Sequence, residues 1–481
     1  MKKNNDIATT ICAVSTPAGV GGIAVIRVSG KEALPVCSKI FVPAQKNKTL
    51  EKQKAYTVSY GKIFANREIA GQAHNDKDGE LLDEVLATVF RAPHSFTGED
   101  IVEISCHGSA FIQQEILKLL LTNGCELAKP GEFTQRAFLN GKMDLSQAEA
   151  VADVITSASA AAHRLAMNQM RGGFSNELHQ LRGKLLNFVS LMELELDFGE
   201  EEVEFADRSQ LIELAEDIQT RLAGLVQSFS WGNVLKNGVP VVIVGETNAG
   251  KSTLLNLLLN EEKAIVSDIH GTTRDVIEDV ININGILFRF IDTAGIRDTT
   301  DEIESLGIER TFRKIEQAAI ILWLIDTTHF NKEIEYIADQ IVPRTKGKKL
   351  ILVFNKIDKI SPEEQQILEE EFLPQVPAER IYLSAKYKKN TEKLEKILLK
   401  AANLPELNET DVVVTNLRHY EALTKALESV SRVEEGLKIN LSGDLIAQDI
   451  RECMHYLGEI TGEISTDEVL GNIFGKFCIG K

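Results

Sequence analysis

The stretch Gly245-Glu-Thr-Asn-Ala-Gly-Lys-Ser252 has the residue types and spacing of a phosphate-binding loop. It lies between an apolar run at 239–244 and an apolar segment at 253–259, which is the strand–loop–helix context that such a loop requires. Its glycines would let backbone N–H groups face phosphate oxygens, Lys251 is a cation for the β and γ oxygens, and Ser252 offers a hydroxyl to Mg²⁺. For this pattern alone, a glycine-rich turn that binds nothing is the alternative.

Two later motifs could complete a phosphate and metal site. Gly271-Thr-Thr273 lies in a polar loop, from which a second hydroxyl could reach the metal. Asp292-Thr-Ala-Gly295 follows an apolar strand predicted at 286–291. Asp292 is placed to hold the metal through water, and Gly295 is placed to sense the γ-phosphate.

Two further motifs point to guanine as the base. Asn355-Lys-Ile-Asp358 follows an aliphatic run, and Asp358 can accept both guanine N1–H and N2–H, a pair that adenine does not supply. Ser384-Ala-Lys386 ends the last predicted strand, where a backbone amide can meet guanine O6. The order and spacing of the motifs resemble those of translation-factor-like GTPases. The expected GTP-binding residues are Asn248, Ala249, Gly250, Lys251, Ser252, Thr253, Ser267, Asp268, Ile269, His270, Gly271, Thr272, Thr273, Asp292, Thr293, Ala294, Gly295, Asn355, Lys356, Asp358, Ser384, Ala385 and Lys386.

The residues after Gly295 are Ile296-Arg297, where a Ras-type enzyme carries the glutamine that positions water. Another group must therefore do this work. Asn248 in the loop resembles the asparagine of potassium-dependent GTPases that dimerise across their nucleotide faces, in which K⁺ replaces an arginine finger. An ordinary loop cap is the alternative for Asn248. The implied K⁺ ligands are Asn248, Ser267, Ile269 and Thr272, and the implied Mg²⁺ ligands are Ser252 and Thr273.

The elements that must position these residues fall into several regions along the 481-residue chain, a length that predicts about two to four domains. Residues 1–141 mix β-type runs with glycine turns and one apolar-periodic helix at about 109–121, which predicts a small α+β domain. Residues 142–238 and 399–481 have helical texture. Between them, 239–398 alternates strands and helices, as a largely parallel sheet requires. We therefore expect a multidomain α+β protein in which a Ras-like α/β P-loop domain is inserted into a helical domain.

The charge balance and the distribution of apolar residues limit the possible partners. The chain has 53 basic and 71 acidic residues, a net charge of −18, so any nucleic-acid contact needs a local basic patch or a partner. We find neither a signal peptide nor a run of about 18 apolar residues, and we expect a cytoplasmic protein without stable membrane association. Its six cysteines form no CxxC pair, so we expect mostly reduced thiols.

Motifs outside the nucleotide region resemble those of the tRNA-modification GTPases called MnmE or TrmE. They are Thr97-Gly-Glu-Asp100, Glu103-Ile-Ser-Cys-His-Gly108, the stretch from Pro130 to Glu149, and Phe477-Cys-Ile-Gly-Lys481. These motifs have no generic reason to occur together, and the resemblance runs from end to end. One departure concerns the phosphate loop, where Glu246-Thr247 replaces the more usual Arg-Pro and adds a negative charge.

This resemblance implies an N-terminal folate-binding and dimerisation domain, a helical domain and the GTPase domain. It further implies a homodimer that forms a heterotetramer with the flavoprotein MnmG or GidA, the FAD being on that partner. Together they would add an aminomethyl or carboxymethylaminomethyl group to C5 of the tRNA wobble uridine, with the carbon coming from a tetrahydrofolate. Matching positions suggest that Arg27, Glu103, Lys142 and Lys481 line the folate site, where cations suit the glutamate tail and a carboxylate suits the pterin. Without the resemblance, each of these residues would be interpreted as a member of a surface ion pair.

Two residues are candidates for catalytic roles. By the resemblance, Glu304 positions the attacking water through another water; a solvated helix-start carboxylate is the alternative, and Glu302 is the neighbour with which it could be confused. Cys478 in the tail could act as a nucleophile toward the one-carbon unit or uridine C6. A packed or merely terminal thiol is the alternative for Cys478.

Two other functions share the nucleotide motifs. An RNA-binding ribosome-assembly GTPase would carry a basic KH-type GXXG module or a second GTPase domain, and the sequence has neither. A membrane-remodelling GTPase would need a basic amphipathic or apolar insertion segment, which we do not find. The tRNA-modification hypothesis is therefore preferred.

Overall fold

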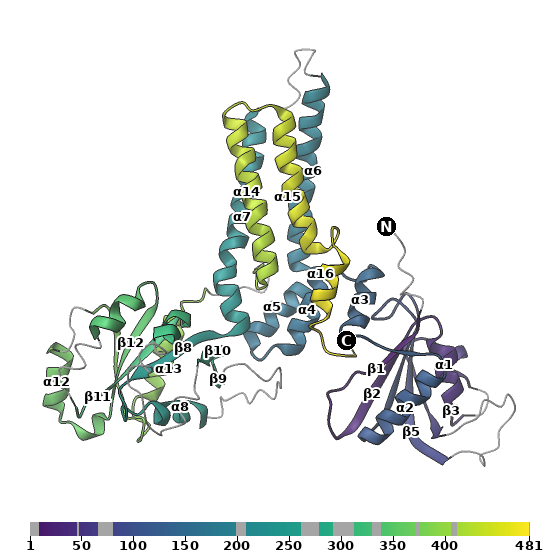
Figure 1. Ribbon diagram of the computed structural model, residues 1–481, viewed down its shortest axis with the longest axis horizontal. Helices are drawn as coiled ribbons and strands as arrows, with labels where there is room; N and C mark the ends of the chain where they lie inside the picture. Colours follow the sequence, from purple (N-terminus) through teal and green to yellow (C-terminus); the bar gives the residue numbers. More distant parts are fainter. Residues whose placement is uncertain are drawn as a thin grey trace. The chain divides into compact units, whose positions relative to one another are not determined.

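A computed structural model describes residues 9–45, 48–65, 80–198, 208–260, 279–291, 312–329, 338–371, 376–405 and 411–480 (Figure 1). Contacts divide the chain into two compact units. The first comprises Met1–Ala152, Gln169–Gly183 and Met454–Lys481, and the second comprises Asp153–Asn168 and Lys184–Cys453. Each unit therefore combines segments that are far apart in the sequence.

A seven-stranded sheet with the order β3-β4-β5-β6-β2-β1-β7 forms the framework of the first unit. All neighbouring strands are antiparallel except the parallel pair β1 and β7. Alternate residues such as Ile26 and Val28 are buried against helices α1 (Ala33–Ile40) and α2 (Ala110–Thr122), so the intervening residues lie on the opposite face of the sheet. The strands are β1 (Ile11–Val14), β2 (Gly21–Ser29), β3 (Phe41–Pro43), β4 (Thr57–Ala65), β5 (Glu80–Phe90), β6 (Ile101–Gly108) and β7 (Glu126–Leu127).

The first unit has more helices than the single one predicted for residues 1–141. The expected helix is α2 (Ala110–Thr122), but α1 (Ala33–Ile40) and α3 (Glu132–Leu139) are also present. Both additional helices have only eight residues, too few for a clear apolar period. Helix α3 is also polar in sequence, because one of its buried residues is Arg136. The prediction of one helix was therefore wrong.

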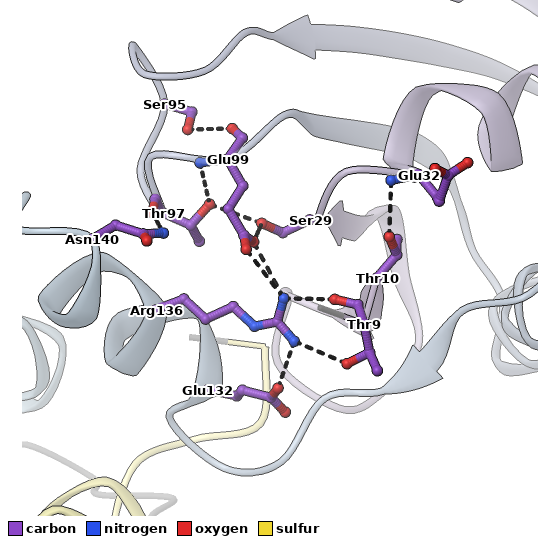
Figure 2. A network of polar contacts seen from close by, with 10 residues as sticks. All are labelled: Thr9, Thr10, Ser29, Glu32, Ser95, Thr97, Glu99, Glu132, Arg136 and Asn140. Atoms are coloured by element: carbon purple, nitrogen blue, oxygen red, sulfur yellow. Dashed lines mark hydrogen bonds and ion pairs between the residues drawn. The ribbon is translucent and has the colours of Figure 1, made fainter. Parts of the chain in front are cut away.

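Arg136 is the centre of a buried polar network in the first unit (Figure 2). Its guanidinium donates to the backbone oxygen of Thr9 at 2.7 Å and to Glu132 at 2.8 Å, and it lies 3.3 Å from both carboxylate oxygens of Glu99. Glu99 in turn accepts from the Ser29 hydroxyl at 2.8 Å. The network thus joins α3 to strand β2 and to the loop that follows β5.

Long helices make up the remaining expected helical region. They are α4 (Leu145–Thr156), α5 (Ala160–Met170), α6 (Gly173–Phe198), α7 (Arg208–Asn237), α14 (Leu417–Lys438), α15 (Gly443–Thr461) and α16 (Asp467–Phe474). In the second unit, Lys184 of α6 pairs with Asp217 of α7, and Arg432 of α14 pairs with Asp449 of α15 at 2.8 Å. Helices α7 and α14 pack along their lengths. None of the helices in the ranges given above is long and apolar enough to cross a membrane.

A six-stranded sheet with the order β13-β12-β11-β8-β10-β9 forms the α/β part of the second unit. Its pairs are parallel except β9 with β10. Apolar clusters cover both faces, which explains why every residue of β11 is buried. The elements are β8 (Val239–Gly245), β9 (Asp279–Ile283), β10 (Ile286–Phe290), β11 (Ile320–Asp326), β12 (Lys349–Asn355), β13 (Glu379–Tyr382), α8 (Lys251–Asn260), α12 (Pro362–Glu371) and α13 (Thr391–Ala402), with short 3₁₀ helices at Val342–Thr345 and Ile357–Lys359. A further short 3₁₀ helix, Leu50–Lys52, belongs to the first unit.

The α/β part leaves and rejoins the helical part beside the same helix. Strand β8 begins directly after α7. On the return path, the Val414 N–H donates to the hydroxyl of Ser228 in α7 at 3.0 Å. A Cβ on Gly232 would lie 2.3 Å from the Val414 oxygen, so this close approach requires glycine. The expected fold class is confirmed: an N-terminal α+β domain, and a helical domain with an inserted Ras-like α/β domain.

We predict that Arg136→Met destabilises the first unit by about 3–5 kcal/mol, because it leaves the Glu99 and Glu132 carboxylates without their buried cation. Hydrogen exchange of the β2 amides in the full chain measures this local free energy. The control is Lys118→Met, whose ammonium is exposed and lies 3.7 Å from Glu115; we expect a change within about 0.5 kcal/mol. Equal effects of the two substitutions would contradict a special role for the buried network.

Candidate functional site

The phosphate-binding loop joins β8 to α8 in the backbone conformation that its glycines permit. Gly250 has φ +99°, and a Cβ there would lie 2.3 Å from Asn355 Nδ2. Asn248 also has positive φ, +66°, a conformation that asparagine tolerates better than most residues. Ala249 is fully buried, whereas Ser252 and Thr253 lie in the first turn of α8. The loop therefore opens at a helix N-terminus, which favours anions.

The Lys251 side chain folds back over the loop. Its ammonium donates to the backbone oxygens of Gly245 at 2.8 Å and of Glu246 at 2.7 Å. Burial lowers the pKa of Lys251 below its usual value, although the nearby charge of Glu246 opposes this change. The cation is thus held above the loop by carbonyl groups that a phosphate could replace as partners.

Asn355 connects the phosphate loop to the predicted guanine loop. It is 3 % exposed at the end of β12. Its Nδ2 donates to the backbone oxygen of Ala249 at 2.8 Å, and its Oδ1 accepts from the Ala385 N–H at 3.0 Å. One side chain therefore satisfies a polar group on each of two loops that are more than a hundred residues apart.

Neighbouring groups hold the rest of the expected base pocket. Asp358 is exposed and accepts from the Ser384 hydroxyl at 2.5 Å, which orients its carboxylate. Lys356, at φ +69°, pairs with Asp326 at the end of β11. Burial alone would raise the pKa of Asp326, but hydrogen bonds from Lys356 and Thr328 hold it below its usual value. Lys386 is exposed beside the ring of Tyr387.

Several expected site residues lie outside the described residues. They include the loop residues proposed to hold K⁺ and Mg²⁺, the motif after β10, the proposed water-positioning glutamate and the C-terminal lysine. These are Ser267, Asp268, Ile269, His270, Gly271, Thr272, Thr273, Asp292, Thr293, Ala294, Gly295, Glu304 and Lys481.

A second polar site lies in the first unit, on the sheet face opposite α1 and α2. Arg27 of β2 lies directly across from Glu103 of β6. The Arg27 Nε donates to Glu103 Oε1 at 2.9 Å, and Nη2 lies 2.8 Å from the same oxygen. The guanidinium carbon is 5.5 Å from the ring centre of Phe96 and 5.6 Å from that of Phe133. The pair is thus placed against aromatic surface, with both side chains partly exposed.

Lys142 lines a cavity of about 360 Å³ in the same unit. Its ammonium donates to the backbone oxygen of Pro93 at 3.0 Å. Phe96 lines the cavity, and its ring also contacts the Arg27 guanidinium, so it is shared by the cavity and the Arg27–Glu103 pair. None of the sequence motifs includes the aromatic residues here, although Phe96 directly precedes the motif that begins at Thr97. The lining residues are Tyr56, Phe90, His94, Ser95, Phe96 and Lys142.

The C-terminal tail lies against the first unit near the start of the chain. The Ser15 hydroxyl donates to the Gly480 oxygen at 3.1 Å. A Cβ on Gly480 would lie 2.3 Å from the Val14 oxygen, so the tail approaches β1 closely. Cys478 is exposed, and the other five cysteines are buried; all six are free thiols. The exposure of Cys478 is compatible with its predicted role as a nucleophile, which needs access to a substrate.

Comparisons with known proteins bear on the whole chain. Residues 10–142 match the family model described as GTP-binding protein TrmE N-terminus, and residues 145–478 match the model described as MnmE helical domain. Among solved structures, the chain resembles Era of Aquifex aeolicus bound to GDP and AlF4⁻, with a TM-score of 0.27 and 33 % identity over 40 % of this chain and 66 % of that one.

Curated relatives match nearly the full length. The chain is 58 % identical to the tRNA modification GTPase MnmE of Bacteroides fragilis strain YCH46, over 98 % of this chain and 99 % of that protein. It is 58 % identical to the protein of the same name from Parabacteroides distasonis, over 98 % and 100 % of the two chains. The corresponding protein of Flavobacterium johnsoniae is 54 % identical over 98 % and 99 %. Identity of this extent, together with the two matched family models, shows that the chain belongs to the MnmE family of tRNA modification GTPases.

Proposed function

We propose that this chain binds GTP with Mg²⁺ and hydrolyses it as a subunit of a cytoplasmic enzyme that modifies tRNA. The observation that carries the nucleotide part is the bridge made by Asn355 between Ala249 of the phosphate loop and Ala385 of the guanine loop. The donors fit this ligand, because the loop offers backbone N–H groups, Lys251 and the Ser252 hydroxyl at a helix N-terminus. The tRNA part is supported by family membership.

The finer proposal concerns the reaction and the partners. The modified position would be C5 of the wobble uridine, and the enzyme would be a homodimer that joins the flavoprotein MnmG, which carries FAD. When bound, a tetrahydrofolate would supply the one-carbon unit. The first unit offers a cation, a carboxylate and an aromatic cavity in one region, which suits a pterin with an anionic tail. Arg27, Glu103, Lys142 and Lys481 would hold it, within proposed domain limits of 1–141, 142–238, 239–398 and 399–481.

Hydrolysis would use residues near the γ-phosphate. We propose that Asn248 contributes its side-chain oxygen to a K⁺ site together with Ser267, Ile269 and Thr272. Neutral oxygens in such number suit a large, weakly hydrated cation better than Mg²⁺, which needs closer ligands. When bound, K⁺ supplies positive charge beside the β and γ oxygens. Ser252 and Thr273 would bind Mg²⁺, and Glu304 would orient the attacking water.

Asp358→Ala should weaken GTP binding by about 100-fold or more, because two hydrogen bonds from guanine to a carboxylate are lost. The matched control is Ser384→Ala, which removes only the hydroxyl that orients Asp358. We expect that control to weaken binding by about tenfold or less. Calorimetric titration of both full-length variants with a non-hydrolysable GTP analogue measures the difference. An unchanged affinity of Asp358→Ala for the GTP analogue would show that Asp358 does not bind the guanine base.

Hydrolysis should be faster in KCl than in NaCl at equal ionic strength, by on the order of tenfold or more, because K⁺ offsets charge that develops on the leaving phosphate. Asn248→Ala should lose this response, since it removes a ligand. Phosphate release under steady-state conditions gives the rates, and light scattering tests whether K⁺ also favours dimerisation. Equal wild-type rates in the two salts would return Asn248 to the role of a loop cap.

Cells lacking this protein should lose the aminomethyl-type group on their wobble uridines, as measured by mass spectrometry of tRNA nucleosides. The wild-type gene should restore it. Arg27→Met should not, because it removes the cation proposed to hold the folate and leaves Glu103 unpaired. Lys118→Met, in an exposed pair on the same unit, serves as the control and should restore the modification. Normal wobble nucleosides in the deletion strain would refute the proposed tRNA reaction.

A further inference from the structure

The loop that follows β13 carries an exposed basic segment, Lys386-Tyr-Lys-Lys389. All four of its side chains are exposed, and Tyr387 is 63 % exposed. Residues 386–396 contain five lysines and two glutamates, a net charge of +3 in a chain whose net charge is −18. Within the part of the chain that the structure describes, no carboxylate forms an ion pair with the three lysines of the basic segment. The segment is therefore a local concentration of positive charge on an acidic protein.

Backbone hydrogen bonds fix the shape of the basic segment. Ser384 and Lys389 exchange two N–H to oxygen bonds of 3.2 and 3.1 Å, which close the loop between them. The Asn390 Nδ2 donates to the Tyr382 oxygen at 2.7 Å and anchors the end of the loop to β13. Lys388 has φ +55°, a conformation that favours glycine or asparagine. The fold gives no reason for a lysine at this position, and backbone strain of this kind points to a functional role.

Tyr387 adds an aromatic surface to the positive charge. The Lys386 ammonium lies 5.4 Å from the centre of the Tyr387 ring. A single-stranded nucleic acid can use both features at once, because a base stacks on the ring while the phosphates on either side of it meet ammonium groups. An acidic protein surface or an anionic membrane supplies negative charge without flat stacking partners. The chemistry of the segment therefore fits RNA with unpaired bases.

A second basic segment in the same α/β part, residues 343–349, has a different environment. The Lys348 ammonium donates to three backbone oxygens of the segment before β11, and the Arg344 guanidinium lies 3.8 Å from the centre of an aromatic ring. These two side chains thus serve the fold. Lys346 and Lys349 are exposed, but residues 343–349 include no aromatic residue. This segment precedes β12, whereas the basic segment follows the parallel strand β13, so the two lie at opposite edges of the sheet.

We propose that Lys388 and Lys389 contact phosphates of the tRNA substrate and that Tyr387 stacks on one of its unpaired bases. This inference rests on the proposed function, since it takes tRNA as the substrate. The first residues of the same loop belong to the nucleotide site: Ser384 donates to Asp358, and the Ala385 N–H donates to the buried asparagine at the end of β12. One loop would thus serve the nucleotide with its first residues and the RNA with the residues that follow.

The charge part is tested by filter binding of total tRNA, taken from cells that lack this protein, to full-length variants. Lys388→Gln/Lys389→Gln should weaken tRNA binding by about three- to tenfold and reduce the slope of log affinity against log salt concentration by about one to two. The matched control is Lys346→Gln/Lys349→Gln, which removes the same charge at the opposite edge of the sheet and should bind tRNA as the wild type does. Equal losses in the two double variants would overturn the inference, because the net charge alone would then explain them.

The stacking part is tested at Tyr387 with the same tRNA. Tyr387→Ala should weaken tRNA binding by about fivefold or more, whereas Tyr387→Phe keeps the ring and should bind nearly as the wild type does. An unchanged tRNA affinity in Tyr387→Ala would overturn the stacking contact. Calorimetric titration with GDP should give the wild-type affinity in every variant, which establishes that the variants are folded and that the nucleotide site is intact.

Two further outcomes would also overturn the inference. One is a wild-type protein that does not bind tRNA even at low salt. The other is a Lys388→Gln/Lys389→Gln variant that keeps its tRNA affinity but no longer sediments with phosphatidylglycerol vesicles as the wild type does, which would assign the segment to a membrane. The proposed function is tested separately by the wobble nucleosides of the deletion strain. Loss of the modification there, with no effect of the variants on tRNA binding, refutes only this inference.

Discussion

The nucleotide site depends on one buried amide side chain. Asn355 satisfies a carbonyl of the phosphate loop and an N–H group of the loop after β13, and both contacts are removed from water. A buried polar group without a partner is costly, so each loop is held where Asn355 can reach it. Gly250 makes this possible, because a side chain there would collide with Asn355 Nδ2. This contact therefore sets the distance between the loop that follows β8 and the loop that follows β13.

In the first unit, a buried charged side chain likewise joins segments that are distant in the sequence. Arg136 gathers Glu99, Glu132 and the Thr9 carbonyl, and the hydroxyls of Ser29 and Thr97 extend the network toward β2 (Figure 2). Ser29 lies two residues after Arg27 on strand β2. Asn140, which lies two residues before Lys142, donates to the backbone oxygen of Thr97. The network therefore supports the segments that carry Arg27 and Lys142 of the candidate folate site. Such support is what keeps a binding geometry constant.

The basic side chains of the two candidate sites, Arg27 and Lys251, have different partners. Arg27 is paired with Glu103 and lies against aromatic rings, so its orientation is determined before any ligand arrives. Lys251 instead contacts two backbone oxygens. The nearby charge of Glu246 favours its protonated form. A preformed ion pair favours selective recognition of a rigid ligand, whereas an ammonium held by backbone carbonyls can exchange these acceptors for phosphate oxygens. This contrast matches a site that would hold a cofactor and a site that would turn over a nucleotide.

The amino-acid sequence by itself determined the elements with strong local signals. The buried strands at 239–244 and 320–325 were predictable because parallel strands covered on both faces are continuously apolar, and the loop after β8 because phosphate binding demands glycines at particular positions. Helix α3 was not predictable in this way, since its buried residues include an arginine that also needs partners elsewhere in the chain, Thr9 and Glu99. Only the tertiary structure decided that Arg27 faces Glu103, that Phe96 lies both beside Arg27 and on the cavity that Lys142 lines, and that the Lys251 ammonium contacts the Gly245 and Glu246 carbonyls. Periodicity and propensity describe neighbours along the chain, whereas these contacts depend on strand register and loop packing between distant segments.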